Sequence, residues 1–267
     1  MKRSENRMKL RNFISSKMKK KGQVTAFVIL AIIIVIFAVL IYYFYPQIQS
    51  AITGENLNPT SYLQSCIEDD LKSTIDKVSL QGGSVNPSHY LLYQDQKMEY
   101  LCYTNEYYKT CVMQQPLLKN HVEQEIEKAL YLQAEECLSS LEESYKKRGY
   151  NVEMKKGKIS AELLPKRVIL NFNSTITVEK ENTQRYENIK VLVTNNLYEL
   201  VSIAMSILNF EARYGDSETT IYMNYYHDLK VEKIKHVEGS KVYILTDRND
   251  GSKFQFATRS LAWPPGD

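Results

Sequence analysis

Four cysteines are the residues whose chemistry the sequence constrains most closely. Their number is even, no two of them have the C-x-x-C spacing of a metal or redox motif, and all four follow a long apolar segment near the N-terminus. Outside the cytoplasm, such cysteines form disulfides sooner than metal sites or nucleophiles. Three pairings are possible in principle, and we expect Cys66 to pair with Cys137 and Cys102 to pair with Cys111.

The elements predicted around the cysteines favour this pairing. Cys66 and Cys137 each lie on the apolar stripe of an amphipathic helix, and two such helices can bury their stripes by facing one another. Cys102 and Cys111 flank a short chain reversal, where neighbouring strands reach the Cα separation of roughly 4.4–6.8 Å that a disulfide requires. The sequence therefore predicts one disulfide between helices and one within a hairpin.

The other titratable residues match no catalytic or metal-binding pattern. Acidic side chains cluster at 68–70, 135–136 and 142–143, but these positions lie on predicted helices whose polar faces are normally solvated. His121, His227 and His236 lack the spacing of a metal-binding helix. The chain has neither a glycine-rich phosphate loop nor a G-x-S-x-G motif. We therefore predict no catalytic residue, no metal ligand and no cofactor.

Tyrosine is the most unusual feature of the composition, with 20 residues in a chain of 267. Many of the tyrosines lie at 90–108 and 222–226. Because the tyrosine ring combines a large contact area with a polar tip, it suits protein interfaces, although it also packs inside β-rich domains. We predict that Tyr107, Tyr108, Tyr225 and Tyr226 are exposed interaction residues.

One further residue is a candidate for modification. Asn173-Ser174-Thr175 is the one N-x-S/T triplet of the chain that lacks an intervening proline. Such a triplet is an acceptor for N-glycosylation in cells that carry out this reaction on exported proteins. Asn173 is therefore a candidate glycosylation site whose use depends on the cell.

Charge and hydropathy are distributed very unevenly along the chain. Residues 1–22 contain nine Lys or Arg and one acid, and residues 24–45 contain no charge at all. A helix of 22 residues would be about 33 Å long, enough to cross a hydrocarbon core of about 30 Å. The basic cluster before this segment predicts a cytoplasmic N-terminus, with everything after residue 45 outside.

The body that follows the basic tail has a different charge. Without residues 1–22, the chain has 25 basic and 30 acidic residues. A protein that binds nucleic acid needs a concentrated positive surface to neutralise phosphates. A mildly acidic body therefore argues against nucleic acid and leaves the membrane and other proteins as the expected partners.

The predicted fold class is α+β, with one N-terminal transmembrane helix followed by an extracytoplasmic domain of amphipathic helices, a disulfide hairpin and an antiparallel sheet with one packed helix. Apolar residues three or four positions apart predict helices at about 61–79 and 120–147, and an alternating pattern predicts strands from residue 150 onward. Asn196 and Glu199 have the spacing of a capping box that opens a helix at 196–214. The expected regions are a basic tail (1–23), a transmembrane helix (24–45), a linker (46–59), a helical disulfide-bonded region (60–149) and a sheet region (150–267).

The start of the apolar segment resembles an archaeal type IV prepilin-type signal. The stretch Lys20-Lys21-Gly22-Gln23-Val24-Thr25-Ala26-Phe27 has basic residues, a small residue, Gln and then an unbroken apolar helix. The resemblance implies peptidase cleavage between Gly22 and Gln23. Phe27 stands where this family usually has Glu, so we expect a membrane-bound partner or a small oligomer sooner than a filament. The pieces Leu80-Gln81-Gly82-Gly83 and Phe254-Gln255-Phe256-Ala257 resemble uncharacterised membrane-anchored surface proteins of archaea.

These observations predict a structural or protein-interaction role at the cell surface, including a pilin-like one. The expected partners are other surface or membrane proteins, or further copies of this chain. The alternative is a membrane-anchored extracytoplasmic enzyme, such as a hydrolase, whose site is assembled from residues that are scattered in the sequence. A pocket lined by several carboxylates or histidines with perturbed pKa values would favour the enzyme, and an exposed tyrosine-rich surface would favour binding.

Overall fold

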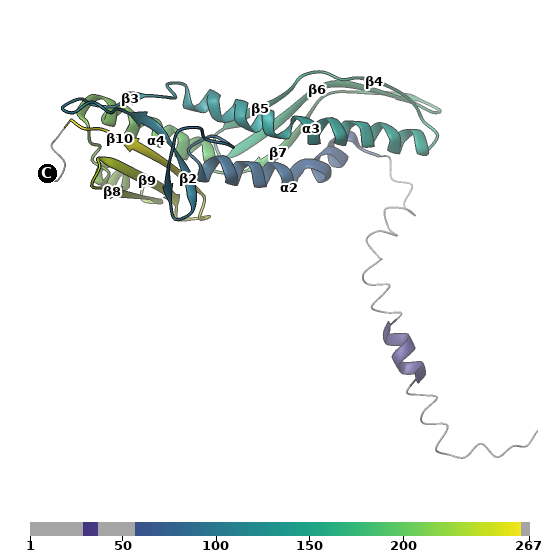
Figure 1. The fold of residues 1–267 in the computed structure, drawn as a ribbon. Coiled ribbons are helices and arrows are strands. Elements are labelled where there is room, and N and C mark those ends of the chain that lie inside the picture. Colours follow the sequence, from purple (N-terminus) through teal and green to yellow (C-terminus); the bar gives the residue numbers. More distant parts are fainter. Residues whose placement is uncertain (1–28, 37–56, 263–267) are drawn as a thin grey trace, which may run out of the picture. The chain divides into compact units, whose positions relative to one another are not determined.

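The computed structural model describes residues 29–36 and 57–262 (Figure 1). The chain divides into two compact units, Met1–Asn56 and Leu57–Asp267. In the first unit, residues 29–36 are helical and their side chains are exposed. The rest of the expected transmembrane helix, the basic tail and the expected cleavage site at Gly22 and Gln23 lie outside the described residues. Within the described ranges, no helix combines the length and the apolar character that a membrane crossing needs.

The second unit is α+β, as predicted. Its elements, in chain order, are α2 (Pro59–Leu80), β1 (Tyr90–Tyr93), β2 (Gln96–Tyr103), β3 (Val112–Met113), α3 (Leu118–Lys147), β4 (Asn151–Lys155), β5 (Ile159–Leu164), β6 (Arg167–Glu179), β7 (Thr183–Thr194), α4 (Leu197–Tyr214), α5 (Thr220–Tyr225), β8 (Leu229–Lys235), β9 (Ser240–Asp247) and β10 (Lys253–Arg259).

The strands form two sheets, whereas the sequence predicted one antiparallel sheet. The first sheet has the order β1-β2-β10-β9-β8, with β3 paired to β2, and the second has the order β4-β6-β5, with β7 paired to β6. The second sheet is antiparallel throughout, but β2 and β10 pair in parallel. This pairing joins a strand that precedes α3 to the last strand of the chain. Such a long-range partnership has no signal in a local alternating pattern.

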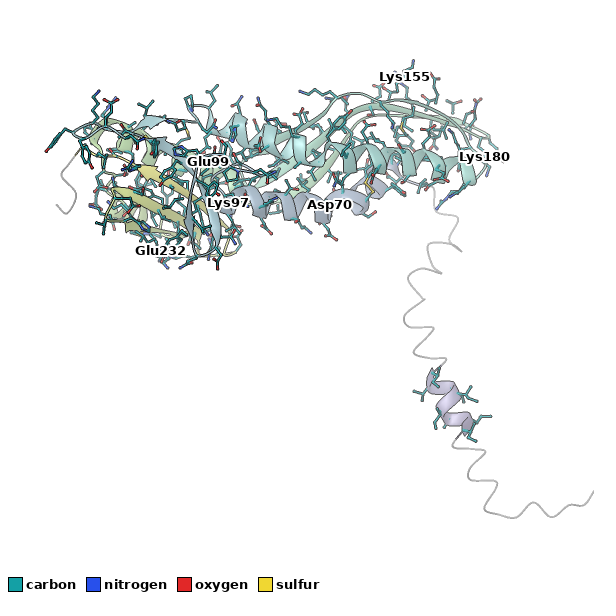
Figure 2. All side chains as sticks on the ribbon, viewed as in Figure 1. Asp70, Lys97, Glu99, Lys155, Lys180 and Glu232 are labelled. Carbon is teal, nitrogen blue, oxygen red and sulfur yellow. A yellow bond between two sulfur atoms is a disulfide. The ribbon has the colours of Figure 1, made fainter. Side chains whose placement is uncertain are left out.

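Helices α2 and α3 lie side by side along one face of the second sheet (Figure 1). Both bury an apolar stripe: Leu63, Ile67 and Leu71 of α2 are fully buried. Asp70 lies on the solvent side of α2 (Figure 2), which fits a solvated role for the acidic cluster at 68–70. The chain leaves α2 through Gly82, whose φ of +80° is readily adopted only by glycine.

Both predicted disulfides are present. Cys66 of α2 is bonded to Cys137 of α3, with a Cα separation of 6.0 Å. Cys102 of β2 is bonded to Cys111, just before β3, with a Cα separation of 5.3 Å. Strands β2 and β3 pair antiparallel, so the second disulfide closes a hairpin-like loop, as the sequence predicted.

Helix α4 connects the two sheets. It contacts β10, β9 and β2 of the first sheet and β6 and β5 of the second. One buried apolar cluster runs from the α2–α3 pair through α4 to the inner face of the first sheet. The helix begins and ends where the sequence predicted, and Gly215 closes it in the left-handed conformation at φ +81°. The exposed residues of α4 are Ser202, Asn209, Phe210, Arg213 and Tyr214.

The predicted capping box at the start of α4 is wrong. The side chain of Asn196 makes no capping hydrogen bond. Instead, Asn195 Oδ1 accepts from the Leu197 N–H at 2.8 Å, and Glu199 Oε1 accepts from the Lys166 N–H at 2.9 Å. The cause is tertiary: the Asn196 amide donates to two carboxylates of the β9–β10 turn, and Glu199 bonds to the turn between β5 and β6.

Candidate functional site

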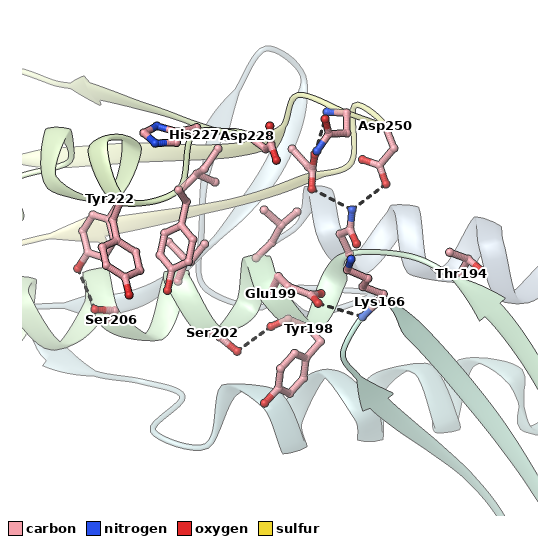
Figure 3. A pocket seen from close by; sticks show the side chains of 18 residues that line it. Lys166, Thr194, Tyr198, Glu199, Ser202, Ser206, Tyr222, His227, Asp228 and Asp250 are labelled. Carbon is pink, nitrogen blue, oxygen red and sulfur yellow. Dashed lines mark hydrogen bonds between the residues drawn. The ribbon is translucent and has the colours of Figure 1, made fainter.

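An open groove with a volume of ≈970 Å³ runs along the outer side of α4 (Figure 3). We call it the α4–α5 groove. Its walls come from α4, from α5 and the residues after it, from the β9–β10 turn, and from the edge of the second sheet. The lining residues are Lys166, Thr194, Asn196, Tyr198, Glu199, Leu200, Ser202, Ile203, Ser206, Tyr222, Tyr225, Tyr226, His227, Asp228, Leu229, Asp247, Asn249 and Asp250.

One end of the groove is aromatic. Helix α5 has only six residues and no buried side chain, so its tyrosines remain available on the surface. The Tyr222 hydroxyl is 2.9 Å from Ser206 Oγ of α4, which ties α5 to the groove floor. The rings of Tyr225 and Tyr226 pack edge to face, with 4.9 Å between their centroids. Tyr225 is 78% exposed and Tyr226 is 48% exposed. Two of the four tyrosines predicted for interaction therefore border the groove.

The other end of the groove is acidic. Asn196 Nδ2 donates to Asp247 Oδ2 at 2.9 Å and to Asp250 Oδ2 at 3.1 Å (Figure 3). The remaining oxygens of these carboxylates accept backbone N–H groups of their own turn, Asp247 Oδ1 from Asn249 and Asp250 Oδ1 from Ser252, both at 2.8 Å. Each carboxylate is thus held in a fixed direction by two hydrogen bonds.

Two more carboxylates complete the acidic end. Asp228 follows α5, and Glu199 lies on the first turn of α4. Lys166 adopts φ +60° in the turn between β5 and β6, where its N–H donates to Glu199 and its carbonyl accepts from the Asn195 N–H at 3.2 Å. Glu199 Oε2 has no hydrogen-bond partner among the described residues. The second sheet therefore fixes the start of α4 and the position of Glu199.

The groove acids have no ion-pair partner, and in this they resemble other surface acids of the described residues such as Asp69, Asp70 and Asp76. Lysines elsewhere pair with Glu68, Glu123 and Glu142, for example, at 2.5–2.6 Å. Within the described part of the chain, no ion pair of 4.0 Å or less involves a carboxylate of the groove. The donors to Glu199, Asp247 and Asp250 are neutral N–H groups.

The carboxyl groups whose pKa is raised lie elsewhere. Burial raises the pKa of Glu99 and of Glu211, and neither residue lines the groove. The Glu99 carboxylate accepts a hydrogen bond from the Ser84 hydroxyl, and Ser84 Oγ is 2.8 Å from His121 Nε2. A nucleophilic serine must reach a substrate and give its proton to the base. Ser84 is only 5% exposed and its hydroxyl bonds to Glu99, so this cluster does not fit nucleophilic catalysis.

The other predicted site residues lie outside the groove. Tyr107 and Tyr108 are 65% and 79% exposed on the loop that the Cys102–Cys111 disulfide closes. The Tyr108 N–H donates to the Leu261 carbonyl at 2.7 Å, so the loop is fixed to the C-terminal end of the first sheet. Asn173 is exposed on β6, next to a break in the β6–β7 register.

Sequence reasoning missed the acidic end of the groove. The Asn249-Asp250-Gly251 turn is visible as a hairpin signal, but nothing local places it beside Asn196 or Asp228. Over the residues that the structure describes, no group of three or more His, Cys, Asp or Glu is arranged to hold a metal ion. The groove therefore combines carboxylates with polar and aromatic side chains.

The chain matches no protein-family model, no curated protein and no solved structure.

Proposed function

We propose that this protein is a single-pass, membrane-anchored, extracytoplasmic protein that acts by binding other proteins, or further copies of itself, at the cell surface. Three sequence features support the location: the nine-to-one charge bias of residues 1–22, the 22 uncharged residues that follow, and the prepilin-like signal at their junction. The two disulfides of the domain support it as well, because disulfides persist in oxidising compartments.

The observation that carries the binding role is the exposure of Tyr225 and Tyr226 at the edge of the α4–α5 groove. Tyrosine loses little conformational entropy on binding and contributes both apolar contact and a hydroxyl. Tyrosine is enriched among the residues that contribute most of the binding energy at protein interfaces. The enzymatic alternative has less support, because the carboxyl groups with raised pKa values, Glu99 and Glu211, are buried away from the groove.

A cross-linking experiment on intact cells tests this proposal. We expect the double variant Tyr225→Ser/Tyr226→Ser of the full-length protein to lose its cross-linked partners while its melting temperature stays nearly unchanged, because exposed side chains contribute little to stability. The matched control is Tyr131→Ser/Leu132→Ser on α3, where both side chains are also exposed. Capture that is equal in wild type and in the Tyr225/Tyr226 variant would refute a binding role for the groove.

The proposed location has a separate test. Protease treatment of intact cells should digest the domain from residue 57 onward and leave the N-terminal tail protected. Protection of the domain together with digestion of the tail would reverse the assignment. N-terminal sequencing of the membrane-derived protein would then report whether the chain begins at Gln23, as the resemblance to a prepilin-type signal implies.

A further inference from the structure

We infer that the acidic end of the α4–α5 groove receives a lysine or arginine side chain of a partner polypeptide. This inference rests on the proposed binding role and adds the chemistry of the partner. It starts from charge: the groove is lined by Glu199, Asp228, Asp247 and Asp250, and among its 18 lining residues Lys166 is the one Lys or Arg.

Two of the groove carboxylates share one neutral donor. Asp247 and Asp250 accept from the same amide nitrogen, that of Asn196, so two negative charges are neighbours with only a neutral donor between them. Like charges at such separations repel one another, the more strongly where water is partly excluded. An ammonium or guanidinium group would replace this repulsion by charge-assisted hydrogen bonds, which are stronger than those to a neutral amide.

The acids are also held in place before any ligand arrives. One oxygen of Asp247 and one of Asp250 are fixed by backbone N–H groups of the β9–β10 turn, and Glu199 is fixed by the Lys166 N–H. Glu199 Oε2 is buried and has no hydrogen-bond partner in the described part of the protein. Fixed acceptors reduce the entropy that is lost on binding.

The expected cation is organic. Ca²⁺ is bound by roughly six to eight oxygen ligands, and Mg²⁺ requires an octahedral set of ligands. No group of three acids or histidines in the described ranges has such an arrangement, and the Asn196 amide nitrogen lies between two of the carboxylates. N–H donors of a basic side chain, which reach out singly or in pairs, suit acceptors that are spread along a groove.

The groove fits a polypeptide better than a small amine. Its volume of ≈970 Å³ is at the upper limit of roughly 300–1,000 Å³ for small-molecule sites. Its lining also includes Tyr222, Tyr225 and Tyr226 of the α5 segment, and Tyr222 lies away from Asp250 (Figure 3). An extended segment can place a basic side chain at one end and an apolar or aromatic side chain at the other. A tyrosine face can also attract a second basic group.

Fluorescence anisotropy with the full-length, disulfide-bonded protein tests the inference. The probe is a fluorescein-labelled hexapeptide of alternating Lys and Leu, and the comparison probe is the same peptide with Glu in place of Lys. We expect the Lys peptide to bind and its affinity to fall with added salt. Asp228→Asn should weaken binding about tenfold, because a hydrogen bond to a charged group is worth roughly that factor. The side chain of Asp228 has no described hydrogen bond or ion pair that its substitution would break.

The matched control is the triple variant Asp69→Asn/Asp70→Asn/Asp76→Asn, which removes three exposed acids from α2. It should bind the Lys peptide as the wild type does. Three results would overturn the inference: no binding of the Lys peptide, equal binding of the Glu peptide, or equal losses in the Asp228 variant and the α2 control. Displacement of the labelled peptide by millimolar lysinamide as effective as that by the unlabelled Lys peptide is a further outcome. That result would overturn the inference of a polypeptide partner and indicate a small amine as the ligand.

The outcome separates this inference from the proposed function. If Tyr225→Ser/Tyr226→Ser abolishes partner capture but Asp228→Asn does not, the groove binds its partner through the tyrosines. The inference that a basic side chain of the partner binds the acids is then wrong. If neither change affects capture, the binding role of the groove fails as well.

Discussion

A buried ion pair at the end of α4 allows a sharp test of how the domain is held together. Glu211 is completely buried, and Lys241 of β9 donates to its two carboxylate oxygens at 3.0 and 2.9 Å. Lys241 also donates to the Gly215 carbonyl, and the Tyr243 hydroxyl donates to Glu211. Lys241→Met keeps most of the side-chain volume and removes the ammonium group, so it leaves a buried carboxylate without its cation.

The expected cost of Lys241→Met is about 3–5 kcal/mol of unfolding free energy, the range found when one partner of a buried ion pair is removed. This cost should depend on pH. Burial already raises the pKa of Glu211, and loss of the lysine charge should raise that pKa further. A carboxyl group with a raised pKa in the folded state contributes stability below its unfolded pKa of about 4.3 and loses it as the pH rises through the folded pKa. The deficit of the variant should therefore be larger at pH 8 than at pH 5.

Urea unfolding followed by circular dichroism at pH 5, 6.5 and 8 measures this effect. The wild type, Lys241→Met, Glu211→Gln and the double variant Glu211→Gln/Lys241→Met form a thermodynamic cycle. The double variant should be more stable at pH 8 than Lys241→Met alone, because it contains no buried charge. A deficit of Lys241→Met below about 1 kcal/mol, or one that is the same at all three pH values, would refute the reasoning.

Three further predictions concern other parts of the domain. Cys66→Ser should cost about 4 kcal/mol and Cys102→Ser about 2–3 kcal/mol in urea unfolding, because the disulfides close loops of 71 and 9 residues; the reverse order would contradict the loop-entropy argument. Gly157→Ala should cost about 1–3 kcal/mol, since its Cβ would lie 1.7 Å from the backbone oxygen of Asn173; a melting temperature equal to that of the wild type would refute this. Burial raises the pKa of Glu99, so the wild type should lose stability relative to Glu99→Gln as the pH rises from 4 to 8. A difference in unfolding free energy between the two proteins that stays constant over this pH range would contradict the prediction.

Much of the helical framework could be predicted from local patterns. The stripe of Leu63, Ile67 and Leu71 repeats at helical spacing, and all three residues are buried in α2. The same periodicity in the following helix put Cys137 on the stripe that faces Cys66, and this is why the disulfide pairing could be predicted. Helix α4 was also predicted with its observed bounds, because its apolar residues and Gly215 are local signals.

The sheets and the groove were decided by contacts between distant residues. The pairing of β2 with β10 and the separation into two sheets depend on how α4 packs between them, which no alternating pattern encodes. Asn196 illustrates the reason. Its spacing to Glu199 predicts a helix cap, but tertiary folding brings Asp247 and Asp250 to its amide, and bonds to carboxylates are stronger than a cap. The sequence by itself therefore determined α2, α3, α4 and the disulfides, whereas the short helix α5 was not predicted. Only the tertiary structure gathered four acids and four tyrosines around one groove, because their proximity arises from packing and not from spacing along the chain.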